Sequence, residues 1–331
     1  MTAPSRPPGA AARPFVSPAT LLPLLALVGA VLLAFMMEGY SLYRLSAILV
    51  LAIAVLGLNL LVGLAGILSL GHGAFLAVGG YAVAVAMHHL GLGFYTALPL
   101  AGLACFVLGY LVGFPALRLS SVHLVLVTFS LALATPQILK SSHLAPWTNG
   151  VMGIYLDRPE PPAWSGLSDD QWWYFIALAL FTGLAWCARN LWRSRTGRAL
   201  AAIRDTELAA APQGIPVARY KCLIFGASGF YAGIAGAMNA IVQDFIAPDG
   251  FTLWLSIVLL VAAVTGGVRS VWGALLGAAL VFILPAIAGG LAEAVNMPLY
   301  GLVLLAFVML LPGGLAPALE QLSRRLRRAL P

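Results

Sequence analysis

The chain has 331 residues, of which 61% are hydrophobic and only 9% are charged, and its mean hydropathy is +0.97. Soluble globular domains carry roughly 25% charged residues, so this composition excludes a soluble protein and predicts an integral membrane protein. The net charge of +7 would favour nucleic-acid binding in a soluble chain, but in a membrane chain it must be divided between the two sides of the bilayer. Nucleic acid is therefore not an expected partner.

The apolar runs predict an all-α, polytopic bundle, because each is near the roughly 20 residues that cross a bilayer. Residues 1–19, rich in proline and alanine, are expected to form a cytoplasmic tail before an uncleaved first span. Ten spans are expected, at about 20–37, 45–64, 66–90, 97–115, 119–140, 171–190, 220–242, 252–268, 270–290 and 298–312. The separators at 65 and 269 are so short that the adjoining spans are candidates for broken or re-entrant helices.

Lysine and arginine are divided unequally between alternate loops. With the N-terminus inside, 15 of the 18 basic residues fall on the cytoplasmic side, and the exceptions are Arg44, Lys140 and Arg158. Short cytoplasmic loops hold such an excess, so both termini are predicted to be cytoplasmic. The expected division is a transmembrane domain at 20–315, containing an outer (periplasmic) loop at 141–170 and a cytoplasmic loop at 190–219, followed by a basic cytoplasmic tail at 316–331.

The third expected span begins with GLAGILSLGHGAFLAVGG, residues 63–80, which combines glycines with a serine and a histidine. Glycines on both sides of His72 would allow a broken helix whose freed N–H groups face a polar path. Ser69 and His72 are three residues apart, so we expect them on one helical face. The candidate path residues are Asn59, Ser69, Gly71, His72, Gly73 and Thr128. Alternatively, the glycines only allow close packing and His72 makes an interhelical contact.

A similar pattern returns near the ninth span. GILSLGHGAF (66–75) and GVRSVWGALL (267–276) both begin with glycine and hold serine three residues later. If the two are related, the shared feature is a bend with glycine packing, and the histidine belongs only to the first copy.

The middle of the cytoplasmic loop, GRALAAIRDTELAAA, is rich in helix-forming residues and stops at Pro212 and Gly214. One or two short helices are expected along the cytoplasmic face, exposing Arg204, Asp205 and Glu207. Such a helix can insert into a groove on another protein. The alternative is a solvated, charged linker.

Six strings in chain order carry a family resemblance: LNLLVGLAGILSLGHGAF, LRLSSVHLVLVTFSLA, TNGVMGI, SRTGRALAAIRDTELAAAPQGIPVARYK, GGVRSVWGALLGAAL and LPGGL. Together they resemble the permease subunits of branched-chain amino acid ABC transporters, in particular the longer of the two paralogous permeases. The chain departs from the family pattern at Asn149, where glycine is usual. It also departs at 211–213, where Pro212 is expected to shorten the coupling helix.

The resemblance implies roles for two groups of residues. The cytoplasmic loop would hold the coupling helix that docks on an ATPase subunit, through Arg204, Asp205, Glu207, Ala209, Ala210 and Gly214. The outer loop would face a substrate-binding protein through Thr148, Asn149, Gly150 and Gly153. The implied partners are a paralogous permease, two cytoplasmic ABC ATPase subunits, an extracellular or periplasmic binding protein and the lipid bilayer of a bacterial inner membrane.

The expected function is import of branched-chain or related amino acids by alternating access. The sequence has no GxxxxGK[ST] motif, so ATP is expected to be used by the partner subunits, and this chain is expected to have no enzyme activity, cofactor or metal. Urea, short amides or aromatic acids are alternative cargoes. An ion-coupled secondary transporter is a remote alternative, because it would be expected to carry intramembrane acids. Glu207→Lys is expected to abolish substrate-stimulated ATPase activity without lowering permease abundance.

Overall fold

The computed structural model describes residues 18–37, 39–117, 121–288 and 313–319, together with positions 301, 306 and 309. Within these residues, seven helices are long and apolar enough to cross a membrane. Two further helices, which begin at Pro18 and Val271, have shorter apolar parts, Leu25–Met36 and Val271–Pro285. The chain is therefore a multi-pass membrane protein built as a helical bundle, as the sequence predicts.

The elements are α1 (Pro18–Met36), α2 (Tyr40–Asn59), the π turn η1 (Leu60–Leu64), α3 (His72–Leu90), α4 (Phe94–Ala116), α5 (Ser121–Leu139), α6 (Ala145–Thr148), η2 (Gly150–Met152), β1 (Ile154–Tyr155), α7 (Asp169–Arg193), α8 (Arg195–Asp205), α9 (Glu207–Ala210), η3 (Ala211–Gln213), α10 (Val217–Val242), β2 (Phe245–Ile246), η4 (Pro248–Gly250), α11 (Leu253–Gly266) and α12 (Val271–Ala288). Nine of the ten expected spans coincide with one of these helices. The tenth, at about 298–312, lies almost wholly outside the described residues, as do positions 1–17 and 320–331 of the two tails. The side of the membrane on which each terminus lies stays a prediction.

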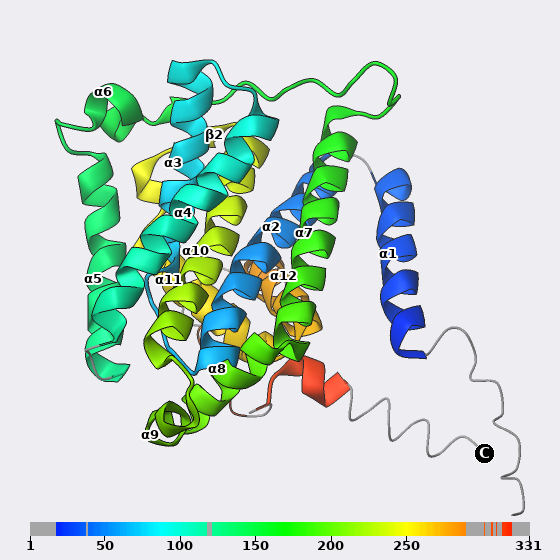
Figure 1. The fold of residues 1–331 in the computed structure, drawn as a ribbon. Helices are drawn as coiled ribbons and strands as arrows, with labels where there is room; N and C mark the ends of the chain where they lie inside the picture. The colour runs from blue at the N-terminus through cyan, green and yellow to red at the C-terminus, as the bar shows by residue number, and fades with distance from the viewer. Residues whose placement is uncertain are drawn as a thin grey trace, which may run out of the picture.

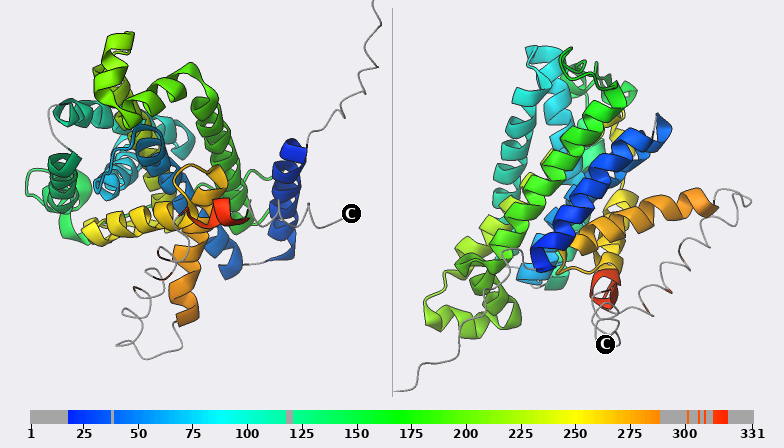
Figure 2. Two further views of the ribbon diagram at one scale, coloured as in Figure 1. Left: turned by 90° about the horizontal axis from the view of Figure 1, so that it is seen from below. Right: turned by 90° about the vertical axis from the view of Figure 1, so that its right-hand side faces the viewer.

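Helices α2 and α10 form the centre of the bundle (Figure 1). The apolar window of α2 is 83% buried and that of α10 is 78% buried, and α10 packs against α2, α3 and α4. The corresponding windows of α5 and α7 are only 33% and 28% buried, so much of their apolar surface is left for lipid or for other subunits. Helix α1 stands at the edge beside α7, and α12 is steeply inclined to the other helices (Figure 2).

The crossing of α3 and α10 is unusually close because glycines face each other there. A Cβ atom on residue 79 would lie 2.5 Å from the Cα of Gly233 and would overlap its carbonyl group. One turn further along α10, a Cβ atom on Gly236 would overlap the backbone of Leu76. Small residues allow membrane helices to approach to backbone contact. The packing interpretation of the glycine at position 79 is therefore supported.

A short antiparallel ladder attaches the outer loop to the chain after α10. Ile154 of β1 pairs with Ile246 of β2, and Tyr155 pairs with Phe245. These two-residue strands are a departure from the all-α expectation, but they lie outside the helical bundle and do not change the fold class. They fix the middle of the outer loop over the end of α10 (Figure 1).

Arg158 strengthens this attachment by binding the last turn of α10. Its Nε donates to the carbonyl of Ile241 at 3.0 Å, and its Nη2 donates to the carbonyl of Val242. The same guanidinium forms an ion pair with Asp244. A cation is favourable at a helix C-terminus, where backbone carbonyls are unpaired. One of the few basic residues expected on the outer side therefore has a structural role.

Candidate functional site

A non-helical segment separates α2 from α3. Helix α2 ends in the π turn η1, and Gly66 follows in the left-handed region at φ 68°. Residues 66–71 then form no regular structure until α3 begins at His72. The third span therefore begins six residues later than the expected start at 66. A break is present, but it precedes His72 instead of flanking it, because Gly73 already lies in α3.

The start of α3 lies about half-way across the bundle. His72 contacts Ser228, which is eleven residues from the first residue of α10. At a rise of 1.5 Å per residue, this level is about 16 Å from the end of α10 that adjoins the cytoplasmic loop. The hydrocarbon core of a bilayer is about 30 Å thick. Backbone groups at this depth have no water to bind, so protein atoms must satisfy them.

Hydroxyl groups from two neighbouring helices satisfy the broken backbone. The N–H of Leu70 donates to Oγ1 of Thr128 on α5 at 3.1 Å. The N–H of Gly73 donates to Oγ of Ser256 on α11 at 2.9 Å. Both hydroxyls are buried. The break is thus held by α5 and α11 through single hydrogen bonds rather than by a helical ladder.

Ser69 and His72 do not share a helical face, so that expectation is wrong. Ser69 precedes α3, and its Oγ accepts the N–H of Gly71 at 3.2 Å. Serine side chains commonly bond nearby backbone in this way and so compete with helix formation. Spacing by three residues predicted a shared face only because the helix was assumed to be continuous.

His72 joins three helices. Its Nε2 lies 2.8 Å from Oγ of Ser228 on α10, and that hydroxyl donates to the carbonyl of Gly57 on α2 at 2.7 Å. Because the hydroxyl has one proton and gives it to Gly57, Nε2 must be protonated and must donate to Ser228. Nδ1 is then an acceptor, and it has no partner among the described residues. The imidazole is only 1% exposed, so in this conformation it makes the interhelical contact that the sequence left as an alternative.

Ser228→Ala is expected to destabilise the protein by about 1–3 kcal/mol, because it leaves two buried partners without a hydrogen bond. The melting temperature of the purified chain in detergent should fall measurably. Ser130→Ala is the matched control, since the Ser130 hydroxyl is exposed on α5 and bonds the carbonyl of Leu126 in its own helix. Equal melting temperatures for both variants would contradict the role given to Ser228.

A second break separates α11 from α12, beside the end of α2. Gly267 has φ 112°, and α12 resumes at Val271. Asn59 is buried, and its Nδ2 lies 3.5 Å from the carbonyl of Ser270. A Cβ atom on Gly63 would overlap the carbonyl of Val268. Asn59, a predicted path residue, therefore contacts the second break rather than the first.

The two breaks resemble each other as the sequence pattern suggests. Gly66 and Gly267, which begin the two matching strings, both have positive φ. Ser69 and Ser270, three residues later, each accept the N–H of a following glycine. The shared feature is a glycine bend followed by a serine that binds the backbone, while His72 has no counterpart.

The loop at 190–219, which is predicted to be cytoplasmic, folds into short helices as expected, and these lie at one end of the bundle (Figure 1). Helix α8 begins after Ser194, whose Oγ accepts the N–H of Gly197 at 3.1 Å. Helix α9 has only four residues and gives way to the 3-10 turn η3, which contains Pro212. Gly214, at φ 77°, then turns the chain towards α10. The α-helical segment therefore ends just before Pro212, as predicted, although it is already interrupted at Thr206 between α8 and α9.

The six predicted coupling residues face different directions. Asp205, Ala209 and Gly214 are exposed on the loop. Ala210 is only 2% exposed and faces the protein interior. The first three residues therefore belong to the exposed surface of the loop, on which another protein could dock.

The two remaining residues of that set bind the helical bundle itself. Nη1 of Arg204 donates to the carbonyl of Gly63, at the end of α2, at 2.8 Å. Glu207 forms an ion pair with Lys221, which is near the start of α10 and is only 8% exposed. Both charges connect the loop to the bundle, so the alternative of a freely solvated linker does not describe this loop.

The four predicted outer-loop residues shape a tight turn. Oγ1 of Thr148 donates to the carbonyl of Leu139 at 2.7 Å, and Nδ2 of Asn149 donates to the carbonyl of Gly153 at 2.7 Å. Asn149, Gly150 and Gly153 have φ values of 58°, 56° and 75°. Asparagine tolerates the left-handed region better than most residues, which explains how it can stand where the family pattern has glycine.

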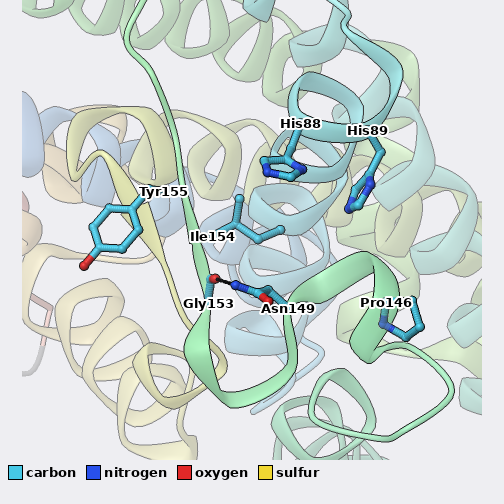
Figure 3. Close-up of a pocket in the computed structure, with 7 residues that line it drawn as sticks. All are labelled: His88, His89, Pro146, Asn149, Gly153, Ile154 and Tyr155. Carbon is cyan, nitrogen blue, oxygen red and sulfur yellow. Dashed lines mark hydrogen bonds between the residues drawn. The ribbon is translucent and has the colours of Figure 1, made fainter.

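A pocket of about 350 Å³ opens beside this turn, lined by His88, His89, Pro146, Asn149, Gly153, Ile154 and Tyr155 (Figure 3). Nε2 of His89 lies 3.1 Å from the carbonyl of Trp147, which links α3 to the outer loop. Among the described residues, no group of three or more histidine, cysteine, aspartate or glutamate side chains is placed to hold a metal ion.

Four residues of these sites were not singled out from the sequence. Ser228 and Ser256 hold the break, and their signal is a hydroxyl among glycine, alanine or large aliphatic residues within an expected span. Val151 and Met152 form the tip of the outer turn and are 66% and 80% exposed. Their signal is two apolar residues between glycines in a polar loop.

The helical bundle, its mid-depth break and the helical loop at one end define a membrane permease. The chain belongs to the family described as branched-chain amino acid transport system / permease component, whose model matches residues 40–312.

Two relatives carry the description high-affinity branched-chain amino acid transport system permease protein LivM. The protein from Salmonella typhimurium is 33% identical over 312 residues, which cover 88% of this chain and 73% of the relative. The protein from Escherichia coli K12 is 33% identical over 283 residues, which cover 79% of this chain and 66% of the relative. The chain thus spans about two thirds to three quarters of the length of these relatives. No solved structure matches the chain significantly.

Proposed function

We propose that this chain is the membrane-spanning permease subunit of an ATP-driven importer for branched-chain or related amino acids in a bacterial inner membrane. Family membership and the printed descriptions of the two relatives support the substrate class. The observation that carries the mechanism is the position of the cytoplasmic loop, which contacts both α10 and the end of α2 next to the break. A force applied to this loop reaches the broken segment directly.

The proposed partners follow from the two ends of the bundle. Two cytoplasmic ABC ATPase subunits serve the transporter, and one docks on the loop surface formed by Asp205, Ala209 and Gly214. A paralogous permease completes the membrane part, and a soluble binding protein docks on the outer turn at 148–153. ATP is bound and hydrolysed by the ATPase subunits, so this chain supplies neither an enzyme activity nor a cofactor site.

The proposed path runs past the start of α3. Five of the predicted path residues lie around the break: Ser69, Gly71, His72, Gly73 and Thr128. Their hydroxyl and peptide groups, which bind protein atoms in this conformation, can instead bind a polar solute. Asn59 lies nearby, beside the second break. In the conformation described here these residues are buried. The hydroxyl of Ser69 accepts the N–H of Gly71, while Thr128, His72 and Gly73 are bonded to Leu70, Ser228 and Ser256. The path opens when α5 and α11 move away from α3. This movement breaks the single hydrogen bonds to Thr128 and Ser256, which the solute can replace, and it unwinds no helix.

The test is uptake into proteoliposomes that contain the complete transporter, with binding protein outside and ATP inside. ATP-dependent accumulation of labelled leucine, isoleucine or valine is the expected result. Accumulation of urea, a short amide or an aromatic acid instead would move the assignment to that cargo. Uptake that needs an ion gradient but no ATP would contradict the proposal, and an ionophore control distinguishes the two energy sources.

A further inference from the structure

One arginine joins the cytoplasmic loop to the broken segment. Arg204 lies in the last turn of α8, and its side chain is 21% exposed. Its Nη1 donates to the carbonyl of Gly63 at 2.8 Å. Its Nε and Nη2 donate to Oδ1 of Asp205 at 3.1 and 2.9 Å. The guanidinium therefore bridges an exposed carboxylate on the loop and a backbone carbonyl inside the bundle.

The end of α2 provides a site for this cation. Gly63 lies in the π turn η1, where the regular ladder of the helix ends. The carbonyl of Val62 accepts the N–H of Gly66 at 3.1 Å, whereas the carbonyl of Gly63 accepts Arg204. Terminal carbonyls of a helix carry partial negative charge and need donors from outside the helix. The arginine thus completes the hydrogen bonding of the turn from which the broken segment begins.

Gly66 leaves room for the aliphatic part of the same side chain. A Cβ atom on residue 66 would overlap Cγ of Arg204 and would lie 3.2 Å from its Cδ. Gly66 is also the residue whose positive φ begins the non-helical segment. Arg204 therefore contacts the first residue of the segment as well as the turn before it, and its displacement must move both.

We propose that Arg204 is a positioning residue that ties movement of the cytoplasmic loop to movement of segment 66–71. The inference rests on the proposed function and deepens it, because the side chain acts towards the membrane and not only towards the ATPase subunit. When a partner displaces Asp205, the shared guanidinium draws the Gly63 carbonyl and Gly66 with it. The far part of the segment is held to Thr128 by one hydrogen bond, and the first turn of α3 is held to Ser256 by another; both can break and reform during this movement.

The experiment compares the complete transporter in proteoliposomes carrying wild-type chain, Arg204→Met, Arg204→Lys or Arg198→Met. The readout is substrate imported per ATP hydrolysed, measured only on complexes that contain all subunits. Arg204→Met should lower this ratio about fivefold or more, since it keeps the aliphatic stem but removes all three hydrogen bonds of the guanidinium. Arg204→Lys should give an intermediate ratio, because an ammonium group lacks the fork that reaches two acceptors. Arg198→Met should keep the wild-type ratio, since Arg198 is exposed on α8 and its guanidinium donates to the carbonyl of Arg193, within its own loop.

Three outcomes would overturn the inference. The first is an unchanged ratio in Arg204→Met. The second is loss of the ATPase subunits from that variant, which would make Arg204 a docking contact. The third is an equal loss in Arg198→Met. If the methionine variant does not fold, a wild-type ratio for Arg204→Lys overturns the inference. Failure of the proposed function is seen separately, as absence of ATP-driven uptake by the wild-type transporter.

Discussion

Replacing Gly79 by leucine is expected to lower the amount of this chain in the membrane by about tenfold or more. The added Cβ alone would overlap the backbone of Gly233, and a backbone atom cannot move aside as a side chain can. Helices α3 and α10 would have to separate, and α10 also packs against α2 and α4. The abundance of a fluorescent fusion in the membrane fraction, together with its melting in detergent, measures the effect.

Gly183→Leu is the matched control for this substitution. Gly183 lies in the membrane-spanning helix α7, and a Cβ atom there would meet nothing within 4 Å. Leucine is at least as apolar as the residue that it replaces, so insertion of α7 into the bilayer should be unaffected. Wild-type abundance and melting for Gly79→Leu would show that α3 and α10 do not approach to backbone contact.

The second large effect is expected for Glu207→Lys, which should lower both the amount of this chain in the membrane and ATP-driven uptake by the transporter. The sequence alone predicted loss of coupling at normal abundance, but Glu207 forms an ion pair with Lys221, whose side chain is mostly buried. The variant would place two ammonium groups together and leave one buried without a partner. Because Glu207 itself is about half exposed, we expect a cost of about 2 kcal/mol, below that of a fully buried pair.

The exchange Glu207→Lys with Lys221→Glu separates stability from coupling. Opposite charges are restored with the positions reversed, so abundance should return towards the wild-type level. If ATP-driven uptake returns as well, the role of Glu207 is to hold the loop on α10. If abundance returns without uptake, the carboxylate also contacts the ATPase subunit. Failure of the exchange to improve abundance would contradict the ion pair.

The spans were predictable because they depend on local composition. A run of about 20 apolar residues can be recognised from the run itself, without knowledge of the rest of the chain. Nine of the ten expected runs coincide with helices. The broken segments were also predictable, because Gly66 and Gly267 supply the backbone freedom that such bends need. Helix formers before Pro212 indicated the loop helices for the same local reason.

The contacts that complete the site were not predictable from such patterns. Ser256 is 183 residues from Gly73, and Thr128 is 58 residues from Leu70, so neither pair leaves a local signal. The direction of Arg204 depends on where α2 ends relative to α8, which only the packed bundle determines. The partner of Arg204 is a backbone carbonyl, which every residue type possesses. The sequence therefore does not distinguish an arginine that is exposed on the loop from one that binds the end of a membrane helix.

The hydrogen bond from the N–H of Gly73 to the hydroxyl of Ser256 has a consequence for the synthesis of the protein. Ser256 is made 183 residues after Gly73, which at about 5–20 residues per second corresponds to roughly 10 to 40 s of synthesis. During this interval α3 has entered the bilayer while the N–H of Gly73 lacks its final acceptor, the hydroxyl of Ser256. Nascent chains that stop before residue 256 should therefore be exposed to membrane quality-control proteases, and the start of α3 becomes secure only when α11 emerges from the ribosome.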